Sequence, residues 1–370
     1  MIQTPYRYDF VGSFLRPDVL KQARKDWKAN KISDEKLKEI EDEQIRLLIQ
    51  KQKAAGFHVL TDGEFRRETW HLDFMWGFKG IAHQATKTGL PFHGEAAMID
   101  DTYLVGKLAY QHHPFVDHFK FVQALEDENT VAKQTIPAPA QFLEQFTMPF
   151  ALENTLKYYA SVEDFKADLV KMYKAFIEEI YAAGCRNLQL DDCSWGLLVD
   201  PRGPEFFNTD QAGLDAIKQE YLDINNAVLT DLPEDLIVNT HVCRGNFHST
   251  YAASGAYDDV ASFLFEKENV HAYFLEFDDS RSGGFESLKY VSGDKKVVLG
   301  LITTKSGELE DKEAVIARIH EAAKYIPLER LCLSPQCGFA SCEIGNKLTE
   351  EEQWAKLKLV KEIAEEVWGE

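Results

Sequence analysis

Short apolar runs alternate with amphipathic stretches along most of the chain, and this alternation is the main guide to its fold. Eight runs have the length and apolar character of buried strands, and each ends in polar residues. The predicted strands are 8–14, 57–64, 133–140, 186–192, 236–243, 272–279, 296–304 and 330–338. The helical period predicts helices over 34–56, 161–184, 209–229, 257–268 and 311–326. Ser161 suits a helix N-cap, and Gly56 and Gly184 suit left-handed positions after helix ends.

Strands that alternate with helices predict an α/β protein with a parallel sheet, and eight units favour a closed (β/α)8 TIM barrel. An open dinucleotide-binding sheet is the alternative, but no GxGxxG follows the first strand. Residues from about 76 to 128 break the rhythm with short alternating stretches, which predict a β-rich excursion between the second and third strands. Since no internal repeat or long linker is present, we expect residues 1–370 to form a single catalytic domain.

Charge and hydropathy exclude several classes of partner. The formal net charge is −20 and no run of Lys and Arg occurs, which argues against nucleic acid as a partner. No segment approaches the roughly 20 apolar residues that cross a bilayer, so no membrane partner is expected. The first residues, MIQTPYRYDFVGSF, lack the pattern of a secretory signal, and six cysteines in so long a chain do not suggest a disulfide framework. We therefore expect a cytoplasmic protein; its oligomeric state is not indicated.

Polar residues at the strand ends are the candidate site, because a parallel barrel carries its active site at the carboxyl ends of its strands. His241 and Cys243 stand two apart and so point to the same side of one strand end. Cys337 follows the last strand, and Glu276 ends a strand between them. Together the four offer two thiolates, an imidazole and a carboxylate, which Zn²⁺ accepts well. The alternative is that the cysteines are core residues, but Cys337 lies in SPQCGF, a loop where packing requires no thiol.

Two carboxylates, Glu64 and Asp191, also follow strands and would face the mouth of the barrel. A ligand ammonium would keep them ionised there, although pairing with nearby arginines such as Arg67 is an alternative for Glu64. The turn at Gly12 and Ser13 offers backbone N–H groups for an anion, or is an ordinary turn. Four aromatic residues in the loops could stack on a planar ligand or pack the excursion: Trp70, Phe74, Trp76 and Trp195.

In this order, the stretches VGSFLRP, TDGEFR, LQLDD, THVCRGNF, LEFDDSRSG and LSPQCGFAS resemble the C-terminal catalytic barrel of cobalamin-independent methionine synthase, in its shorter, single-barrel form. The resemblance implies a zinc site of His241, Cys243, Glu276 and Cys337, with Asp278 as a substitute for Glu276. It also implies a substrate site in which Gly12 and Ser13 hold the carboxylate of an amino acid and Glu64 and Asp191 hold its ammonium.

The function implied by the resemblance is a zinc-dependent methyltransferase. It would activate a small thiol, homocysteine, and methylate it from 5-methyltetrahydrofolate (polyglutamate) to give methionine, with Asp191 and Lys305 as catalytic residues. Where the longer synthases read DIHSP, with a His as proton donor, this chain reads GLITTKSGELED and places Lys305 there. Lys305 would bind a carboxylate of the donor or pair with an acid such as Glu308 or Glu310. A corrinoid or S-methyl donor is the alternative to the folate.

Other classes of function fit the residues less well. A zinc-dependent barrel hydrolase is one alternative, but two thiolate ligands reduce the Lewis acidity that hydrolysis needs, and no HxH pair is present. A metal-free barrel like uroporphyrinogen decarboxylase would leave His241, Cys243 and Cys337 unexplained. A zinc-storage role would make no use of Glu64 and Asp191.

Overall fold

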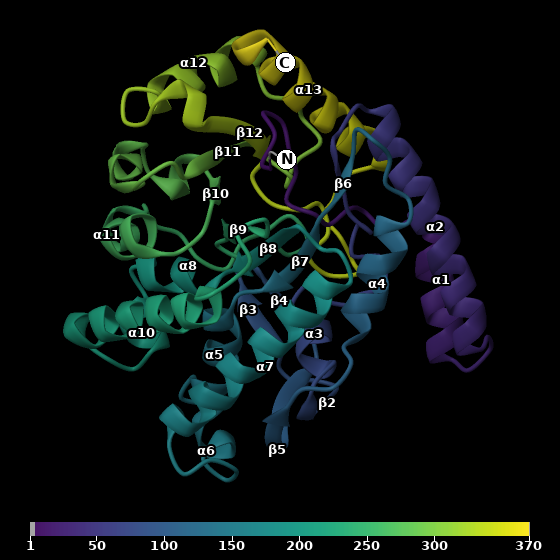
Figure 1. Ribbon diagram of the computed structural model, residues 1–370, viewed down its shortest axis with the longest axis vertical. Helices are drawn as coiled ribbons and strands as arrows, with labels where there is room; N and C mark the ends of the chain where they lie inside the picture. Colours follow the sequence, from purple (N-terminus) through teal and green to yellow (C-terminus); the bar gives the residue numbers. More distant parts are fainter. Residues whose placement is uncertain (1–3, 370) are drawn as a thin grey trace.

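Six parallel strands form the central sheet of the computed structural model, which describes residues 4–369 of the chain (Figure 1). Neighbours in this sheet follow chain order from β7 to β12, so the fold is mixed α/β with a parallel sheet, as predicted. The strands are β7 (Gln134–Pro137), β8 (Asn187–Asp192), β9 (Ile237–Val242), β10 (Ala272–Glu276), β11 (Lys296–Ile302) and β12 (Leu331–Pro335). Because Asp191 pairs in register with His241, and Leu275 with Val242, the polar ends of β8, β9 and β10 meet at one edge.

The second and third predicted strands are shorter than expected. A separate parallel pair joins β1 (Val59–Leu60) to β6 (Val131–Ala132), and only Lys133 separates β6 from β7. The run 133–140 does not stay extended to its end, because helix α5 begins at Pro139. Proline suits the first turn of a helix, where its missing N–H leaves no bond unmade.

The first predicted strand, 8–14, does not form a regular strand. Tyr8 makes one parallel bridge to Leu333 of β12. Beyond it, side chains rather than a neighbouring strand satisfy the carbonyls of residues 10–12. The donors are Lys133 to the carbonyl of Phe10, Gln189 to that of Val11 at 2.8 Å and Thr61 to that of Gly12 at 2.7 Å.

All five predicted helices are present. They are α2 (Asp34–Ala54), α7 (Val162–Ala182), α10 (Gln211–Leu229), α11 (Asp258–Lys267) and α12 (Lys312–Ala322). The Ser161 side chain caps α7 by accepting from the N–H of Asp164, and Gly56 and Gly184 have φ of +85° and +104°. The helices that the pattern did not predict are α1 (Asp18–Lys28), α3 (Leu72–Trp76), α4 (Pro114–Gln123), α5 (Pro139–Thr147), α6 (Leu152–Thr155), α8 (Ser194–Val199), α9 (Gly203–Phe206) and α13 (Glu350–Trp368). Three 3-10 turns complete the fold: η1 (Ser280–Ser282), η2 (Glu286–Tyr290) and η3 (Leu328–Arg330).

Between β1 and β6 lies the excursion. Two antiparallel pairs form it, β2 (Lys79–Gln84) with β5 (Asp101–Ala109) and β3 (Leu90–Phe92) with β4 (Glu95–Ala97). Its last part is the helix α4 and not a strand. The β3–β4 hairpin contacts the loop after β9, where the N–H of His93 donates to the carbonyl of Tyr251 at 2.8 Å. The excursion is therefore attached beside the strand ends that carry the candidate site.

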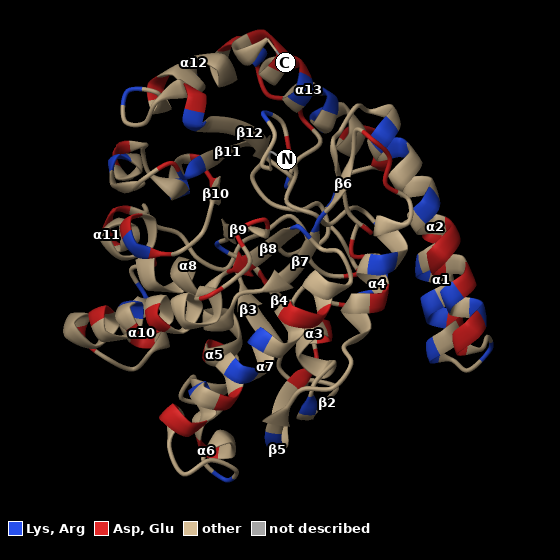
Figure 2. Cartoon of the chain, viewed as in Figure 1, with Lys and Arg blue, Asp and Glu red and all other residues tan. Residues whose placement is uncertain are grey.

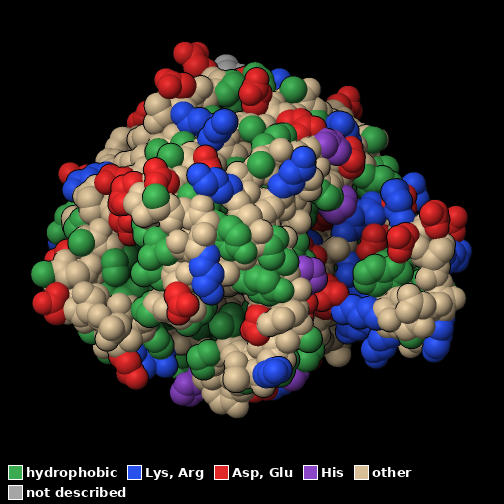
Figure 3. Space-filling model, turned by 90° about the horizontal axis from the view of Figure 1, so that it is seen from below, with side chains coloured by type: hydrophobic (Ala, Val, Ile, Leu, Met, Phe, Trp, Pro, Cys, Tyr) green, Lys and Arg blue, Asp and Glu red, His purple; other side chains and the backbone are tan. Residues whose placement is uncertain are grey.

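A large cluster of buried apolar side chains lies between the sheet and the helices, while four further buried residues, Val11, Phe274, Val298 and Cys332, pack together separately. Charged residues are concentrated on the helices (Figure 2). On the face shown in Figure 3, acidic and basic side chains lie among hydrophobic ones. Within residues 4–369, no helix has the length and apolar character needed to cross a membrane.

Candidate metal centre and amino-acid site

Four side chains from three strand ends converge in the structure: His241, Cys243, Glu276 and Cys337. One potential ligand atom from each lies within 4.8 Å of all the others. His241 belongs to β9 and Cys243 follows that strand, Glu276 ends β10, and Cys337 lies two residues beyond β12. The Cys243 Sγ is 3.7 Å from both the Cys337 Sγ and the Glu276 Oε1. All four side chains are buried.

The donor set fits a zinc ion. The Nδ1 of His241 lies 3.2 Å from the carbonyl oxygen of Phe274, which leaves Nε2 buried and without a hydrogen-bond partner in the described chain. Hydrogen bonding to Cys243 and burial raise the pKa of the Cys337 thiol well above its usual range. Two buried thiols beside a carboxylate repel one another once ionised, so a cation is needed to hold them as thiolates. A free imidazole nitrogen, two sulfurs and one oxygen are ligands that Zn²⁺ prefers.

Glu276, and not Asp278, supplies the carboxylate of this group. Its Oε1 faces the Cys243 sulfur, while its Oε2 accepts from the backbone N–H of Arg244 at 3.1 Å. Asp278 lies beyond the end of β10 and pairs instead with Arg281 at 3.0 Å and Lys305 at 3.3 Å. Asp278 is therefore not a member of the four-residue group in this structure.

Glu64 and Asp191 line the same cavity as the sulfur ligands. Glu64 has a left-handed backbone, with φ of +61°, and its Oε1 accepts from Arg67 at 3.2 Å and from Thr135 at 3.1 Å. Its Oε2 is buried, and no residue among 4–369 hydrogen-bonds to it. A strained backbone and an unpaired carboxylate oxygen are features typical of a ligand site.

Burial, together with the neighbouring charge of Glu64, raises the pKa of Asp191 to about 8. Gln189 donates to its Oδ1 at 2.7 Å, which fixes the orientation of the carboxyl group. Burial likewise raises the pKa of Glu64, against the opposing effect of Arg67 and Arg16. Two carboxyls of this kind in one cavity favour a cationic group such as an ammonium as their ligand.

Ser13 lines the cavity, whereas Gly12 is not among the lining residues. The Ser13 Oγ accepts from the N–H of Ala340 at 3.3 Å, and its carbonyl accepts from the N–H of Phe339 at 2.9 Å. Gly12 has a φ of +156°, and a Cβ at this position would lie 2.8 Å from the Thr135 Cγ2. Gly12 is thus required for close approach of the backbone to β7, and Ser13 carries the polar group that reaches the cavity.

Lys305, the predicted donor-side residue, does not line this cavity in the described chain. Its Nζ pairs with the Oδ2 of Asp278 at 3.3 Å, and not with Glu308 or Glu310, the acids named as the alternative to a donor carboxylate. Glu310 instead pairs with Lys356 at 3.1 Å. Although burial raises the pKa of Asp278, Lys305 and Arg281 outweigh that effect and lower it overall. Lys305 is thus held at the edge of the site by an ionised partner.

Three lining residues were not singled out from the sequence, since only their position in the fold reveals them: Asn246, Gly338 and Ser341. Cys193, for which the sequence favours a structural role, lines the cavity as well. Of the four aromatic candidates, Trp70 alone lines the cavity; Phe74 and Trp195 are fully buried, and Trp76 stacks on His83. The Asp192-to-Val242 register, which places Cys193 beside Cys243, is a long-range pairing that no local pattern indicates.

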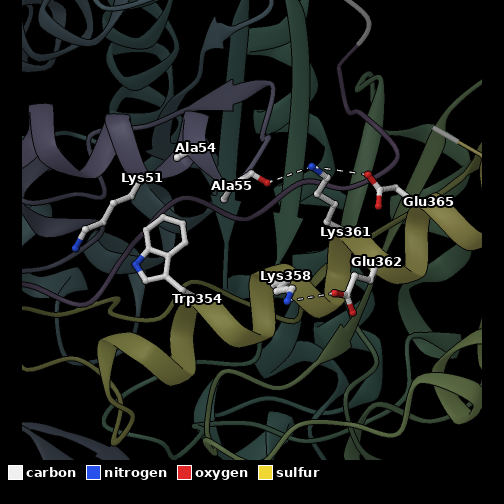
Figure 4. A pocket seen from close by; sticks show the side chains of 8 residues that line it. All are labelled: Lys51, Ala54, Ala55, Trp354, Lys358, Lys361, Glu362 and Glu365. Atoms are coloured by element: carbon white, nitrogen blue, oxygen red, sulfur yellow. Dashed lines mark hydrogen bonds and ion pairs between the residues drawn. The ribbon is translucent and has the colours of Figure 1, made fainter.

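A second hollow lies on the outside of the molecule, between α2 and α13 (Figure 4). Lysines and glutamates line it, but they pair with one another: Lys358 with Glu362 at 3.6 Å and Lys361 with Glu365 at 3.7 Å. It contains none of the candidate residues. The chemistry of this chain therefore lies at the strand ends and not in this surface hollow.

Comparison with known families decides the relationship that the motifs suggested. A family model described as the catalytic domain of cobalamin-independent synthase matches residues 9–366. The chain belongs to the cobalamin-independent methionine synthase family. As a member of this family it is a methyltransferase of methionine biosynthesis, and the resemblance seen in the sequence is confirmed.

Relatives of the family match over nearly the whole chain. The uncharacterised protein YxjG of Bacillus subtilis is 42% identical over 365 residues, which cover 98% of this chain and 95% of that protein. Methionine synthase of Saccharolobus solfataricus is 24% identical over 343 residues, covering 89% and 86% of the two chains. A putative vitamin-B12 independent methionine synthase from Listeria monocytogenes has a similar structure, with a TM-score of 0.77, 36% identity and 99% coverage of both chains.

A B12-independent methionine synthase from Shewanella sp. W3-18-1, solved in complex with selenomethionine, shares the fold. Its TM-score is 0.72 at 19% identity, and the match covers 98% of this chain and 97% of that one.

Proposed function

We propose that this protein methylates the sulfur of homocysteine to give methionine, and that it binds zinc through His241, Cys243, Glu276 and Cys337. One observation carries the proposal: three of the four potential ligands, His241, Cys243 and Cys337, open onto the same cavity as two buried carboxyls, one of which keeps a free oxygen. A small amino acid with a thiol side chain matches both halves of this cavity. Zinc bound at the four side chains would lower the pKa of a coordinated thiol and so supply a nucleophilic sulfur at neutral pH.

In this proposal the residues of the cavity hold the amino-acid end of the substrate. Glu64 and Asp191 would bind the ammonium, which would donate a hydrogen bond to the otherwise unpaired Oε2 of Glu64. The hydroxyl of Ser13, with the turn that follows Gly12, would take the carboxylate. With both charged groups fixed, the side chain of the substrate extends toward Cys243 and Cys337, so the reacting sulfur is positioned before the methyl donor arrives.

Asp191 would also handle a proton. With a pKa of about 8, it is mostly protonated at neutral pH in the empty cavity. An entering ammonium favours the ionised form, so binding of the substrate would release this proton. The ammonium of the substrate therefore binds to an ionised Asp191 carboxylate, whereas in the empty cavity this carboxyl is protonated and its charge need not be stabilised.

The methyl donor is proposed to be 5-methyltetrahydrofolate. Trp70 on the wall of the cavity offers a flat surface for a pterin ring, and Lys305 offers a cation for a carboxylate of the donor. Assays with methyltetrahydrofolate in mono- and triglutamate forms, with methylcobalamin and with S-methylmethionine compare the folate with the corrinoid and S-methyl alternatives. Methyl transfer from the folate alone supports the proposal, and transfer from another donor alone rejects this part of it.

We further propose that residues 1–370 form one catalytic domain in which the strands close into a (β/α)8 barrel. Residues 1–3 and 370 of that range lie outside the described residues. The bridge from Tyr8 to Leu333 and the β1–β6 pair supply backbone contacts on both sides of the gap between β12 and β7. A crystal structure in which the backbone of residues 8–14 lies between β12 and β1, so that no side of the sheet is left open, would establish closure.

The test of function is zinc-edge X-ray absorption on the purified protein, with and without homocysteine, with norleucine as the control amino acid. We expect two sulfur ligands in the resting protein and three after addition of homocysteine, with no change on addition of norleucine. An unchanged sulfur count with zinc bound would reject homocysteine as the thiol that is activated. Absence of bound zinc in protein purified without chelators would reject the metal centre itself.

A further inference from the structure

The second oxygen of Glu276 faces away from the sulfur ligands and lies between two arginines. Its Oε2 is 3.9 Å from the Nη1 of Arg244 and 3.6 Å from the Nη2 of Arg281. Side chains of all three residues are nearly or completely buried, so these charges are poorly screened by water. How strongly the two guanidinium groups attract Oε2 affects how much electron density Oε1 offers to a metal ion.

Arg244 is fixed in place. Its Nε and Nη2 donate to the carbonyl of Gly255 at 2.9 and 2.6 Å, and its guanidinium lies 3.9 Å over the ring of Tyr257. The hydroxyl of the same Tyr257 accepts from the N–H of Glu276 at 3.0 Å. Because every part of this group is anchored, Arg244 makes a constant contribution to Glu276.

Arg281, in contrast, is shared among carboxylates. Its Nη2 donates to the Oδ1 of Asp278 at 3.0 Å and lies farther, at 3.6 Å, from Glu276. Its Nη1 pairs with Asp279 on the exposed side. The other oxygen of Asp278 is taken by Lys305 at 3.3 Å. Asp278 therefore competes with Glu276 for the same guanidinium nitrogen, and in this structure the carboxylate of Asp278 lies closer to it.

We propose that Asp278 is a positioning residue for the metal centre, which holds Arg281 back from Glu276 and so keeps Glu276 a strong ligand. The inference rests on the proposed zinc site. Without the charge of Asp278, the Nη2 of Arg281 would move onto Oε2 and form a full charge-assisted hydrogen bond. That bond would draw electron density from Glu276 and weaken its hold on a metal ion. Asp278 thus acts on the metal through Arg281 and not as a ligand.

The test is the zinc affinity of Asp278→Asn, measured by competition with a chromophoric chelator. We expect it to bind zinc about 10- to 100-fold more weakly than the wild type, the range for loss of a partner that orients a ligand. Asp279→Asn is the matched control, because Asp279 pairs with Nη1 of the same Arg281, whereas the nitrogen that lies near Glu276 is Nη2. It should keep its affinity within about twofold.

A double variant separates positioning from structural damage. If Asp278→Asn acts by releasing Arg281 onto Glu276, then adding Arg281→Gln removes the competitor and restores zinc affinity to within about threefold of wild type. Damage to the fold would instead add to the first loss. The visible absorption of the cobalt-substituted single variant should also shift from that of wild type, since it reports the ligand field.

Two results would overturn the inference: equal zinc affinity for Asp278→Asn and Asp279→Asn, or a double variant that binds no better than Asp278→Asn. If the wild-type protein itself binds no zinc, the proposed function fails first and the variants need not be compared. A folded state of each variant is checked by its thermal unfolding transition.

Discussion

Binding of an amino acid should be strongly dependent on pH, because Asp191 must ionise to receive an ammonium. Its pKa of about 8 makes only about 1% of the carboxyl ionised at pH 6 and about half at pH 8. Affinity scales with the fraction in the competent form, so it should rise about 50-fold across this range. At pH 7 the free energy needed to ionise Asp191 is about 1.4 kcal/mol, since one pKa unit corresponds to 1.36 kcal/mol. The sign follows from burial, which favours the protonated form and so penalises binding at low pH.

Methionine is the ligand for this measurement, because it lacks a thiol that would titrate on its own. Calorimetry on the metal-free protein between about pH 6 and pH 8, in buffers of different ionisation enthalpy, gives both the affinity and the number of protons released. We expect close to one proton released at pH 7. Zinc in the same cavity adds positive charge, which lowers the pKa of Asp191 and moves the profile toward lower pH.

Two variants make this prediction refutable. Asp191→Asn should bind methionine weakly at every pH and lose most of the pH dependence. Glu268→Gln is the matched control: burial raises the pKa of Glu268 to about 8 as well, but this carboxyl does not line the cavity. It should keep the wild-type profile. A flat profile in the wild type, or a full slope retained by Asp191→Asn, would show that Asp191 does not bind the ammonium.

Further variants test the metal ligands, the cavity wall and the donor side. Cys337→Ser should hold less than about a tenth of an equivalent of zinc after dialysis, as measured by atomic absorption, and full zinc content would remove Cys337 from the ligand set. In Gly338→Ala the new Cβ would overlap the Oγ of Ser13, so displacement of that hydroxyl should weaken methionine binding in calorimetry about tenfold while zinc is retained; unaltered affinity would exclude Ser13 from the carboxylate site. Lys305→Met should raise the KM for the methyl donor about tenfold in steady-state assays, while its zinc and methionine affinities stay within about twofold of wild type. A loss of homocysteine binding instead would show that Lys305 does not act on the donor side.

The hydrophobic pattern of the sequence predicted the elements whose backbone hydrogen bonds are made within a regular helix or sheet. Strands β8 to β12 are almost fully buried; β10 to β12 read as mainly apolar runs, whereas β8 and β9 also contain buried polar residues. Helix α7 shows both its N-cap at Ser161 and its left-handed Gly184 in the sequence. The run 8–14 is apolar for a different reason. It is packed inside the molecule, but Lys133, Gln189 and Thr61 satisfy its carbonyls. Apolar character alone cannot distinguish these two cases.

The pair His241 and Cys243 was readable from the sequence alone, because alternation along a strand places residues two apart on one side. The same rule could not decide between Glu276 and Asp278, which are also two apart. The structure decides it because β10 ends at Glu276 and the chain then turns, so Asp278 faces Arg281 and Lys305. For Lys305 the sequence left open a carboxylate of the donor or an acid on its own loop, and its partner in the structure, Asp278, comes from the neighbouring strand end.

The sequence by itself therefore determined the α/β class, the order of the strands, the family and the types of side chain at the strand ends. These depend on hydrophobic period and on short motifs, which act over a few residues. Only the tertiary structure decided which of those side chains meet. Cys337 joins Cys243, Asp191 faces Glu64, and Lys305 pairs with Asp278, because strands far apart in the chain bring their ends together at one edge. That packing sets distances of a few ångströms between charged groups. These distances determine the pKa of Asp191 and the surroundings of the second oxygen of Glu276, and no local pattern sets them.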